Sequence, residues 1–111
     1  MRRAQGAIVN IGAAAAFYRS GAGMGPYAAS KAAVGRMTES LAAEEIRNGV
    51  RVNAVLPTIM DTPANRRDMP DADFSTWVTP DEVAEVIAFL LSSSASGVTG
   101  ASIVVNGRIQ P

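Results

Sequence analysis

The sequence of 111 residues contains neither cysteine nor histidine. Without cysteine the chain can form no disulfide bond and can supply no thiolate as a nucleophile or metal ligand. Without histidine it has no imidazole, so Ser-His triads and zinc sites are excluded and no metal site is expected. Acid–base chemistry must therefore come from tyrosine, lysine or a carboxylate.

The sequence also lacks net charge and long apolar runs. Ten basic and ten acidic residues cancel, which indicates neither a nucleic-acid partner nor an anionic membrane surface. No apolar run reaches eighteen residues, and the arginines at positions 2 and 3 precede no long apolar region. The sequence therefore predicts no membrane span and no secretory signal, and we expect a compact cytoplasmic protein with one core.

Three short apolar runs rich in β-branched residues predict buried strands, at residues 6–12, 50–57 and 101–105. Two longer segments between them, residues 26–49 and 79–92, predict helices. A strand, a helix and a strand in this order imply a right-handed crossover between parallel strands. The sequence therefore predicts an α/β fold with a parallel sheet.

The two predicted helices carry further signals. In the first, the spacing of Val34, Met37, Leu41 and Ile46 predicts an apolar stripe against the sheet. Asn48-Gly49 predicts its end, with the glycine in the left-handed conformation. The second helix begins with Thr79 as N-cap, Pro80 at the first helical position and Glu82 completing a capping box.

Two loops allow more than one interpretation. Gly21, Gly23 and Gly25 suggest a phosphate-binding loop, but they come too late after the first strand, so we favour a flexible loop that enters the helix. The long segment 58–77 contains four aspartates and the pair Arg66-Arg67, with Phe74 and Trp77 as apolar anchors. It can be a lid that closes over a ligand, or an ordered surface loop pinned by its two aromatic residues.

Tyr27 and Lys31 are the candidate catalytic residues. Because they are four residues apart, they lie on the same face of the first helix, one turn from each other. A nearby ammonium lowers the pKa of a phenol from about 10, which suits tyrosine to proton transfer near neutral pH. The alternative is a half-buried aromatic residue next to a solvated charge.

Four motifs occur in a fixed order: Ile8-Val9-Asn10-Ile11, Tyr27-x-x-x-Lys31, Val52-Asn53-Ala54-Val55-Leu56-Pro57 and Thr99-Gly100. Together they resemble the C-terminal half of a short-chain dehydrogenase/reductase, over residues 6–107. The resemblance implies a single partial Rossmann-like domain, residues 1–111, with three strands and two main helices of a doubly wound parallel sheet.

The resemblance also implies an NAD(P)-dependent oxidoreductase that acts on a small molecule. Tyr27 would be the general acid, and Lys31 would lower its pKa and hydrogen-bond the nicotinamide ribose. The residues implied to contact the NAD or NADP cofactor are Asn10, Tyr27, Lys31, Pro57, Thr58, Ile59 and Thr62. Full-length members of the family commonly form homo-oligomers.

The long loop resembles that of one branch of the family. Residues 61–77, together with Gly23-Met24-Gly25 before Tyr27, are similar to the corresponding segments of dihydropteridine reductases. The serine that usually hydrogen-bonds the substrate carbonyl is absent, because the matching stretch reads Gly12-Ala13-Ala14-Ala15-Ala16, and Ser20 is too near Tyr27 to replace it. Dihydropteridine reductases resemble this chain in lacking the serine, and its absence favours a substrate with a conjugated, easily reduced ring. The resemblance of the loop can also reflect shared descent without a shared substrate.

The chain begins almost at the fifth strand of the family, so the half that carries the glycine-rich nucleotide-binding turn is absent. We expect that an internal methionine has been taken as the start, and that the isolated chain binds NAD(P) weakly and is inactive. The alternative is a non-catalytic remnant that acts as an assembly module, with the face formed by Val34, Met37 and Leu41 favouring association.

Overall fold

The computed structural model describes residues 5–14 and 25–109. Several residues named in the sequence analysis lie outside this part of the chain, namely Ala15, Ala16, Ser20, Gly21, Gly23 and Met24. The elements in order are β1 (Gly6–Ile11), α1 (Gly25–Glu45), η2 (Ile46–Asn48), β2 (Val50–Pro57), α2 (Pro63–Asp68), η3 (Phe74–Thr76), α3 (Pro80–Leu91), η4 (Ser93–Ala95) and β3 (Ser102–Val105).

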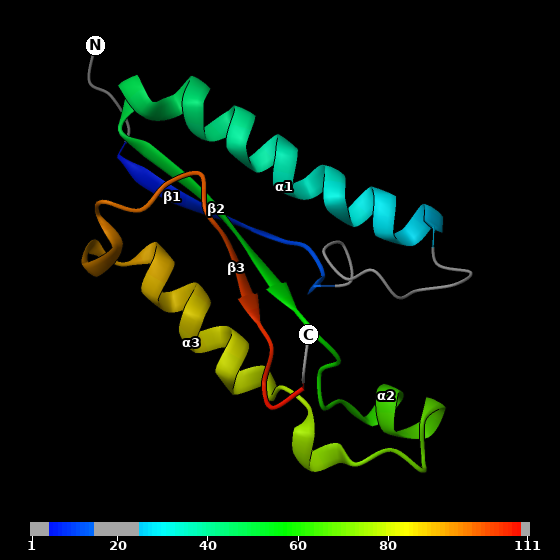
Figure 1. Cartoon of the computed structure of the whole chain (residues 1–111). Coiled ribbons are helices and arrows are strands. Elements are labelled where there is room, and N and C mark those ends of the chain that lie inside the picture. Colours follow the sequence, from blue (N-terminus) through cyan, green and yellow to red (C-terminus); the bar gives the residue numbers. More distant parts are fainter. Residues whose placement is uncertain (1–4, 15–24, 110–111) are drawn as a thin grey trace.

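Within the described residues, the sheet has three parallel strands in the order β1-β2-β3. Gly6 pairs with Val50 at the start of β1, and Pro57 pairs with Val105 at the end of β3. Helix α1 covers one face of the sheet and α3 covers the other (Figure 1). The predicted Rossmann-like α/β arrangement is confirmed, with strands close to the predicted ranges.

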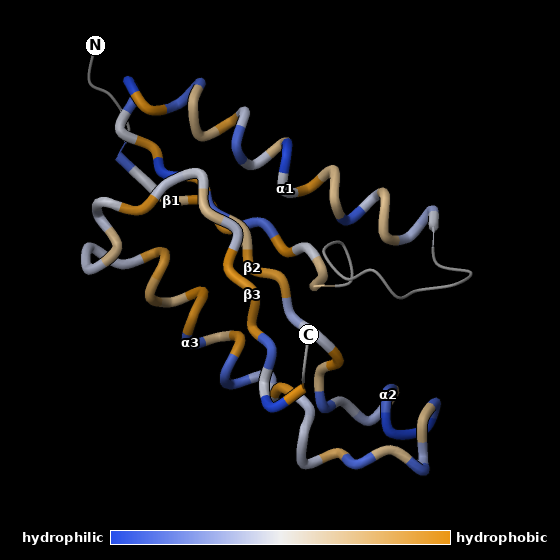
Figure 2. The backbone as a smooth tube through the Cα atoms, viewed as in Figure 1, coloured by the Kyte–Doolittle hydropathy of each residue, from blue (hydrophilic) through white to orange (hydrophobic). Residues whose placement is uncertain are grey.

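Alternate residues of the strands face the two helices. On the α3 side, Val55 of β2 forms a fully enclosed cluster with Val78, Val83 and Leu90. Partly buried side chains pack around this cluster, namely Val9, Met60, Val86, Ile87, Val98, Ile103 and Val105. The strands and the inner side of α3 accordingly carry most of the hydrophobic colour in Figure 2. Each such buried side chain stabilises the fold by roughly 1.5–3 kcal/mol.

The predicted apolar stripe of α1 is wrong for Met37 and Ile46, whereas Val34 and Leu41 are half-buried. Met37 is 69% exposed and Ile46 is 62% exposed. The buried residues of α1 are Gly35, Thr38 and Ala42. Residues with small side chains therefore occupy the buried face, and a Cβ added at Gly35 would make an ordinary contact with Oγ of Ser102, at 3.6 Å.

The predicted helix ends agree with the structure. The Thr79 hydroxyl accepts a hydrogen bond from the Glu82 amide at 3.1 Å, and the Glu82 carboxylate accepts one from the Thr79 amide at 2.8 Å. Pro80 occupies the first turn. Gly49 has φ 74°, as expected for a left-handed residue at the end of a helix.

The segment between β2 and α3 is more regular than the sequence indicated. It contains helix α2, which begins with Thr62 as N-cap and Pro63 in its first turn, and the short turn η3. The order threonine, proline is the same helix-start signal that identified α3 at Thr79 and Pro80. The prediction of an irregular stretch from Thr58 to Trp77 was therefore incomplete.

Candidate active site

Tyr27 and Lys31 occupy the first two turns of α1, at the end of the sheet where the strands finish (Figure 1). The Tyr27 side chain is 47% exposed, so its phenol can reach a ligand. Lys31 is half-buried, and its Nζ lies over the tyrosine ring, 5.8 Å from the ring centroid. The expected shared face of the helix is therefore present, with the ammonium over the face of the ring.

Gly12 brings the end of β1 close to this pair of residues. Its amide donates a 2.9 Å hydrogen bond to the Val55 carbonyl. A Cβ added at Gly12 would lie 3.8 Å from the Lys31 carbonyl oxygen and 2.4 Å from Cδ2 of Leu56. Only glycine therefore fits between β2 and the Tyr27–Lys31 turns without displacing a core side chain. In the sequence, the position of Gly12 directly after the predicted strand is the signal that could have identified this close approach.

Asn10 does not direct its side chain along the strand end. Its Nδ2 donates a 3.0 Å hydrogen bond to Oγ1 of Thr38 in α1. This side chain of the predicted cofactor site therefore links β1 to α1. Asn10 also lines a cavity of about 220 Å³ beside β1, together with Ile11, Val34 and Met37.

Three predicted site residues follow one another at the end of β2. Pro57 is buried. Thr58 donates its amide to the Val105 carbonyl at 3.1 Å and its hydroxyl to the Asn106 carbonyl at 3.2 Å. Ile59 is 38% exposed. The exposed Ile59 side chain is available to a ligand, whereas the Thr58 hydroxyl proton is already used.

Thr62 lies at the start of α2, beyond the same end of the sheet (Figure 1). Its hydroxyl accepts a 3.2 Å hydrogen bond from the Asn65 amide, so the hydroxyl proton is not used in that bond. Asp61 binds Arg66 through two hydrogen bonds of 2.6 and 2.8 Å. This contact with the guanidinium lowers the pKa of the Asp61 carboxyl.

The aromatic residues pin the loop between β2 and α3. Trp77 is 3% exposed. Its ring lies 4.8 Å from that of Phe74, and Cζ of Arg66 lies 4.5 Å from the Phe74 centroid. Of the two interpretations left open by the sequence, these contacts match the ordered loop held by its two aromatic residues.

The residues after β1 offer no side-chain hydroxyl within the described part of the chain. Ala13 is 8% exposed and Ala14 is fully buried. Both methyl groups therefore pack inward at the place where the serine of the family was expected. A substrate oxygen at this edge of the sheet would have the Tyr27 phenol as its candidate proton donor.

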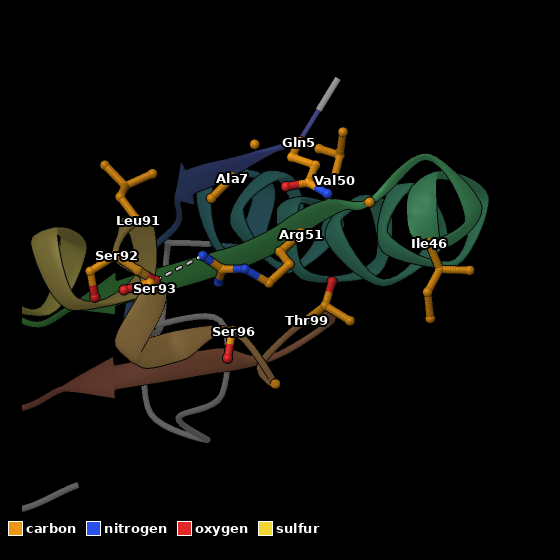
Figure 3. Close-up of a pocket in the computed structure, with 13 residues that line it drawn as sticks. Gln5, Ala7, Ile46, Val50, Arg51, Leu91, Ser92, Ser93, Ser96 and Thr99 are labelled. Carbon is orange, nitrogen blue, oxygen red and sulfur yellow. Dashed lines mark hydrogen bonds between the residues drawn. The ribbon is translucent and has the colours of Figure 1, made fainter. Parts of the chain in front are cut away.

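The larger cavity, of about 650 Å³, lies at the opposite end of the sheet, where the strands begin. Its residues include Gln5, Arg51, Ser92, Ser96 and Thr99 (Figure 3). Arg51 donates to the Leu90 carbonyl at 2.8 Å and to the Ser92 carbonyl at 3.0 Å. The guanidinium therefore caps the C-terminal end of α3, and this cavity is remote from Tyr27.

The described residues contain neither a metal-binding cluster nor a membrane-spanning helix. No cluster of three or more acidic, histidine or cysteine side chains is arranged to hold a metal ion there. No helix in that part of the chain has the length and apolar character needed to cross a bilayer.

The chain matches known proteins over almost its whole length. A family model described as enoyl-(acyl carrier protein) reductase matches residues 1–107. Galactitol 2-dehydrogenase of Rhizobium johnstonii is 42% identical over 113 residues, which cover 92% of this chain and 44% of that protein. The chain therefore spans less than half the length of this relative.

Solved structures agree with the sequence comparison. A gluconate 5-dehydrogenase from Burkholderia cenocepacia in complex with NADP and tartrate is 30% identical, with a TM-score of 0.80, over 93% of this chain and 44% of that one. A 4-hydroxyisoleucine dehydrogenase complexed with NADH is 29% identical, with a TM-score of 0.75, over 93% and 45%.

This chain belongs to the short-chain dehydrogenase/reductase family. The family is one of oxidoreductases that use NAD(P). The comparisons thus confirm the family predicted from the four sequence motifs.

Proposed function

We propose that this chain is the catalytic half of an NAD(P)-dependent oxidoreductase, in which Tyr27 is the general acid and base and Lys31 assists it. The observation that carries the proposal is the position of the two side chains. They lie on consecutive turns of α1, beside Gly12, at the end of a parallel sheet where open α/β folds bind ligands.

The chemistry of Tyr27 follows from its exposure and its charged neighbour. In the reducing direction, the phenolic O–H donates its proton to the substrate atom that becomes negative, and the phenolate remains. The ammonium of Lys31 lies close enough to the ring to stabilise that negative charge. In the oxidising direction, the phenolate takes the proton back. The nicotinamide cofactor supplies or accepts the hydride.

The residues present fit the nicotinamide end of such a cofactor. Gly12 has no side chain at the end of β1, and Ile59 is exposed. The Thr62 hydroxyl accepts a hydrogen bond from the Asn65 amide, so its proton is not used in that bond. Lys31 and Thr62 would supply hydrogen bonds, and Pro57 and Ile59 would supply apolar surface. Thr58 would contribute through its backbone, because its hydroxyl donates to the Asn106 carbonyl.

The substrate class follows from the buried methyl groups of Ala13 and Ala14. Because the described residues directly after β1 carry no hydroxyl that could polarise a carbonyl there, the reaction needs a substrate that accepts hydride readily. We propose a small molecule with a conjugated ring. The resemblance of residues 61–77 to the dihydropteridine reductase loop stays a prediction.

The decisive variant is Tyr27→Phe, assayed by oxidation of NADH or NADPH in the longest protein that contains this chain. We expect turnover to fall by at least about 100-fold, because one positioned proton donor contributes about that much. Cofactor affinity should stay within about threefold, because the ring remains. Tyr18→Phe is the matched control, since Tyr18 is the other tyrosine of the chain. Unchanged turnover in Tyr27→Phe would contradict the proposal.

A further inference from the structure

The turn that follows β3 contacts the first part of the loop between β2 and α3. The Thr58 amide donates to the Val105 carbonyl at 3.1 Å. The Thr58 hydroxyl donates to the Asn106 carbonyl at 3.2 Å. The outgoing limb of the loop, residues 58–61, is therefore tied at its start to the end of β3.

Arg108, two residues further on, binds the returning limb, residues 75–79. Its amide donates to the Thr76 carbonyl at 3.0 Å. Its side chain donates from Nε to the Ser75 carbonyl at 3.2 Å and from Nη2 to the Trp77 carbonyl at 2.6 Å. One arginine thus satisfies the backbone carbonyls of three consecutive residues.

The same guanidinium also reaches the first turn of α3. Nη1 and Nη2 of Arg108 donate to the two oxygens of the Glu82 carboxylate at 2.9 and 2.8 Å. Glu82 is held in turn by the Thr79 amide at 2.8 Å, and the next residue, Val83, is 5% exposed in the core cluster. The returning limb is thereby tied to the rigid part of the fold.

The two limbs also bind each other, which completes the base of the loop. The Val78 amide donates to the Ile59 carbonyl at 3.1 Å, and the Asp61 amide donates to the Val78 carbonyl at 2.8 Å. Thr62, the N-cap of α2, follows Asp61 directly. The position of Thr62 is consequently set by the limb that Arg108 holds through Trp77.

We propose that Arg108 is a positioning residue that fixes the base of the 58–79 loop, and with it Thr62 and α2, at the end of the sheet that carries Tyr27. A guanidinium is suited to this role because its planar donors can serve two carbonyls and a carboxylate at once, whereas an ammonium is a point charge with three donors. The effect on catalysis rests on the proposed function, whereas the effect on the loop does not.

Amide hydrogen exchange of the 111-residue chain tests the effect on the loop, with Arg108→Ala, Arg108→Lys and Arg36→Ala compared with the unchanged protein. Arg36 is the matched control, since its pairing with Glu39 leaves its side chain 83% exposed. In Arg108→Ala we expect the Val78 and Asp61 amides to exchange about tenfold faster, as for a lost hydrogen bond to a charged group. The β2 amides and the Arg36→Ala variant should keep their rates.

The lysine variant separates geometry from charge. Arg108→Lys keeps a positive charge beside Glu82 but cannot reach two carbonyls as well, so the Val78 and Asp61 amides should remain fast. Full protection in Arg108→Lys, an unchanged rate in Arg108→Ala, or equal acceleration throughout β2 would each overturn the proposal.

The catalytic consequence is measured in the longest active protein that contains the chain. Arg108→Ala should raise the KM for the cofactor about tenfold and leave kcat within about threefold, whereas Tyr27→Phe should lower kcat. An unchanged cofactor KM in an active protein would overturn the catalytic part. If the unchanged protein shows no turnover, the proposed function fails, and the exchange rates still decide whether Arg108 holds the loop.

Discussion

Asn10 and Thr38 join the first strand to the helix that carries Tyr27 and Lys31. Nδ2 of Asn10 donates to Oγ1 of Thr38 at 3.0 Å, and that hydroxyl donates to the Val34 carbonyl at 2.7 Å. Thr38 is fully buried. The bond therefore lies in the interior, where an unsatisfied amide is costly, and it connects Asn10 to the fold instead of to the solvent.

Replacing Thr38 with valine should remove this connection with little change of shape. We expect the free energy of unfolding to fall by about 1–2 kcal/mol, because the Asn10 amide loses its acceptor in a half-buried position. Urea unfolding followed by the fluorescence of Trp77, the only tryptophan of the sequence, measures the change. The exposed Ser40→Ala on the same helix should change stability by less than about 0.5 kcal/mol. Equal stability of Thr38→Val and the unchanged protein would contradict this account.

The pairing of Glu82 with Arg108 predicts a loss of stability in acid. The Arg108 hydrogen bonds, followed by that of the Thr79 amide, lower the pKa of Glu82 from 4.5 to about 2. Because the folded value is the lower one, the contribution is complete above the unfolded pKa and disappears as the pH falls from about 5 to about 2. Asp61 and Asp73, whose pKa values are also lowered, act in the same direction.

Urea unfolding at a series of pH values checks this prediction. Glu82→Gln should reduce stability near neutral pH and make the curve flatter between about pH 5 and pH 2. Asp61→Asn should flatten it independently, because its partner is Arg66. An unaltered pH dependence in Glu82→Gln would show that the pair with Arg108 does not stabilise the fold.

Gly107 allows the turn after β3 to lie against the loop. It has φ 61°, and an added Cβ would lie 2.9 Å from the Val78 amide nitrogen and 3.1 Å from the Thr76 carbonyl oxygen. These are backbone atoms that cannot rotate away, so we expect Gly107→Ala to lower the free energy of unfolding by about 1–3 kcal/mol. Gly97→Ala is the control, since a Cβ there meets no atom within 4 Å. A loss of stability no larger than in the control would refute the argument.

Titration of the purified chain with NADH by calorimetry tests how much of the cofactor site is present. Among the described residues, the helix that follows β1 is α1, which begins at Gly25, fourteen residues after Ile11, and not directly after the strand as in a diphosphate-binding turn. We expect a dissociation constant weaker than about 1 mM. The gluconate 5-dehydrogenase of Burkholderia cenocepacia, titrated with NADP, is a positive control. Micromolar affinity of the chain for NADH would disprove the prediction.

The sequence was sufficient for the parts of the fold that local chemistry determines. The three strands follow from apolar runs, and the start of α3 follows from the hydrogen-bonding capacity of Thr79 and Glu82. The same reasoning would have found α2, because Thr62 and Pro63 repeat the threonine–proline signal. That helix was missed because its six residues lack an apolar face.

The packing of α1 could not be obtained from hydrophobicity. Large apolar residues such as Met37 suggested the buried face, but the sheet is contacted through Gly35, Thr38 and Ala42. A close helix–sheet approach favours small side chains over apolar ones, and which of the two dominates depends on the distance between the elements. That distance is a property of the folded chain.

In the candidate site, too, some residues could be predicted from the sequence and others could not. Tyr27 and Lys31 were identified by their spacing, because four residues make one helical turn. The role of Arg108 was not identified, since its partners include main-chain carbonyls 31 and 33 residues away, which carry no sequence signature. Asn10 was assigned to the cofactor from its motif, and only the position of Thr38 shows what its amide binds.

The small residues of α1 also have a mechanical consequence for Tyr27. The helix has 21 residues, and its buried positions, Gly35, Thr38 and Ala42, lie from its middle residue onward. Tyr27 lies about 22 Å from Ala42 along an axis that rises about 1.5 Å per residue. A tilt of about 5° at the packed end would carry the phenol through about 2 Å, and displacements of about 1 Å can cost 100-fold in rate. A small change of angle at the packed residues of α1 is therefore enlarged at Tyr27, so that a larger side chain at the fully buried Thr38 would displace the phenol without touching it.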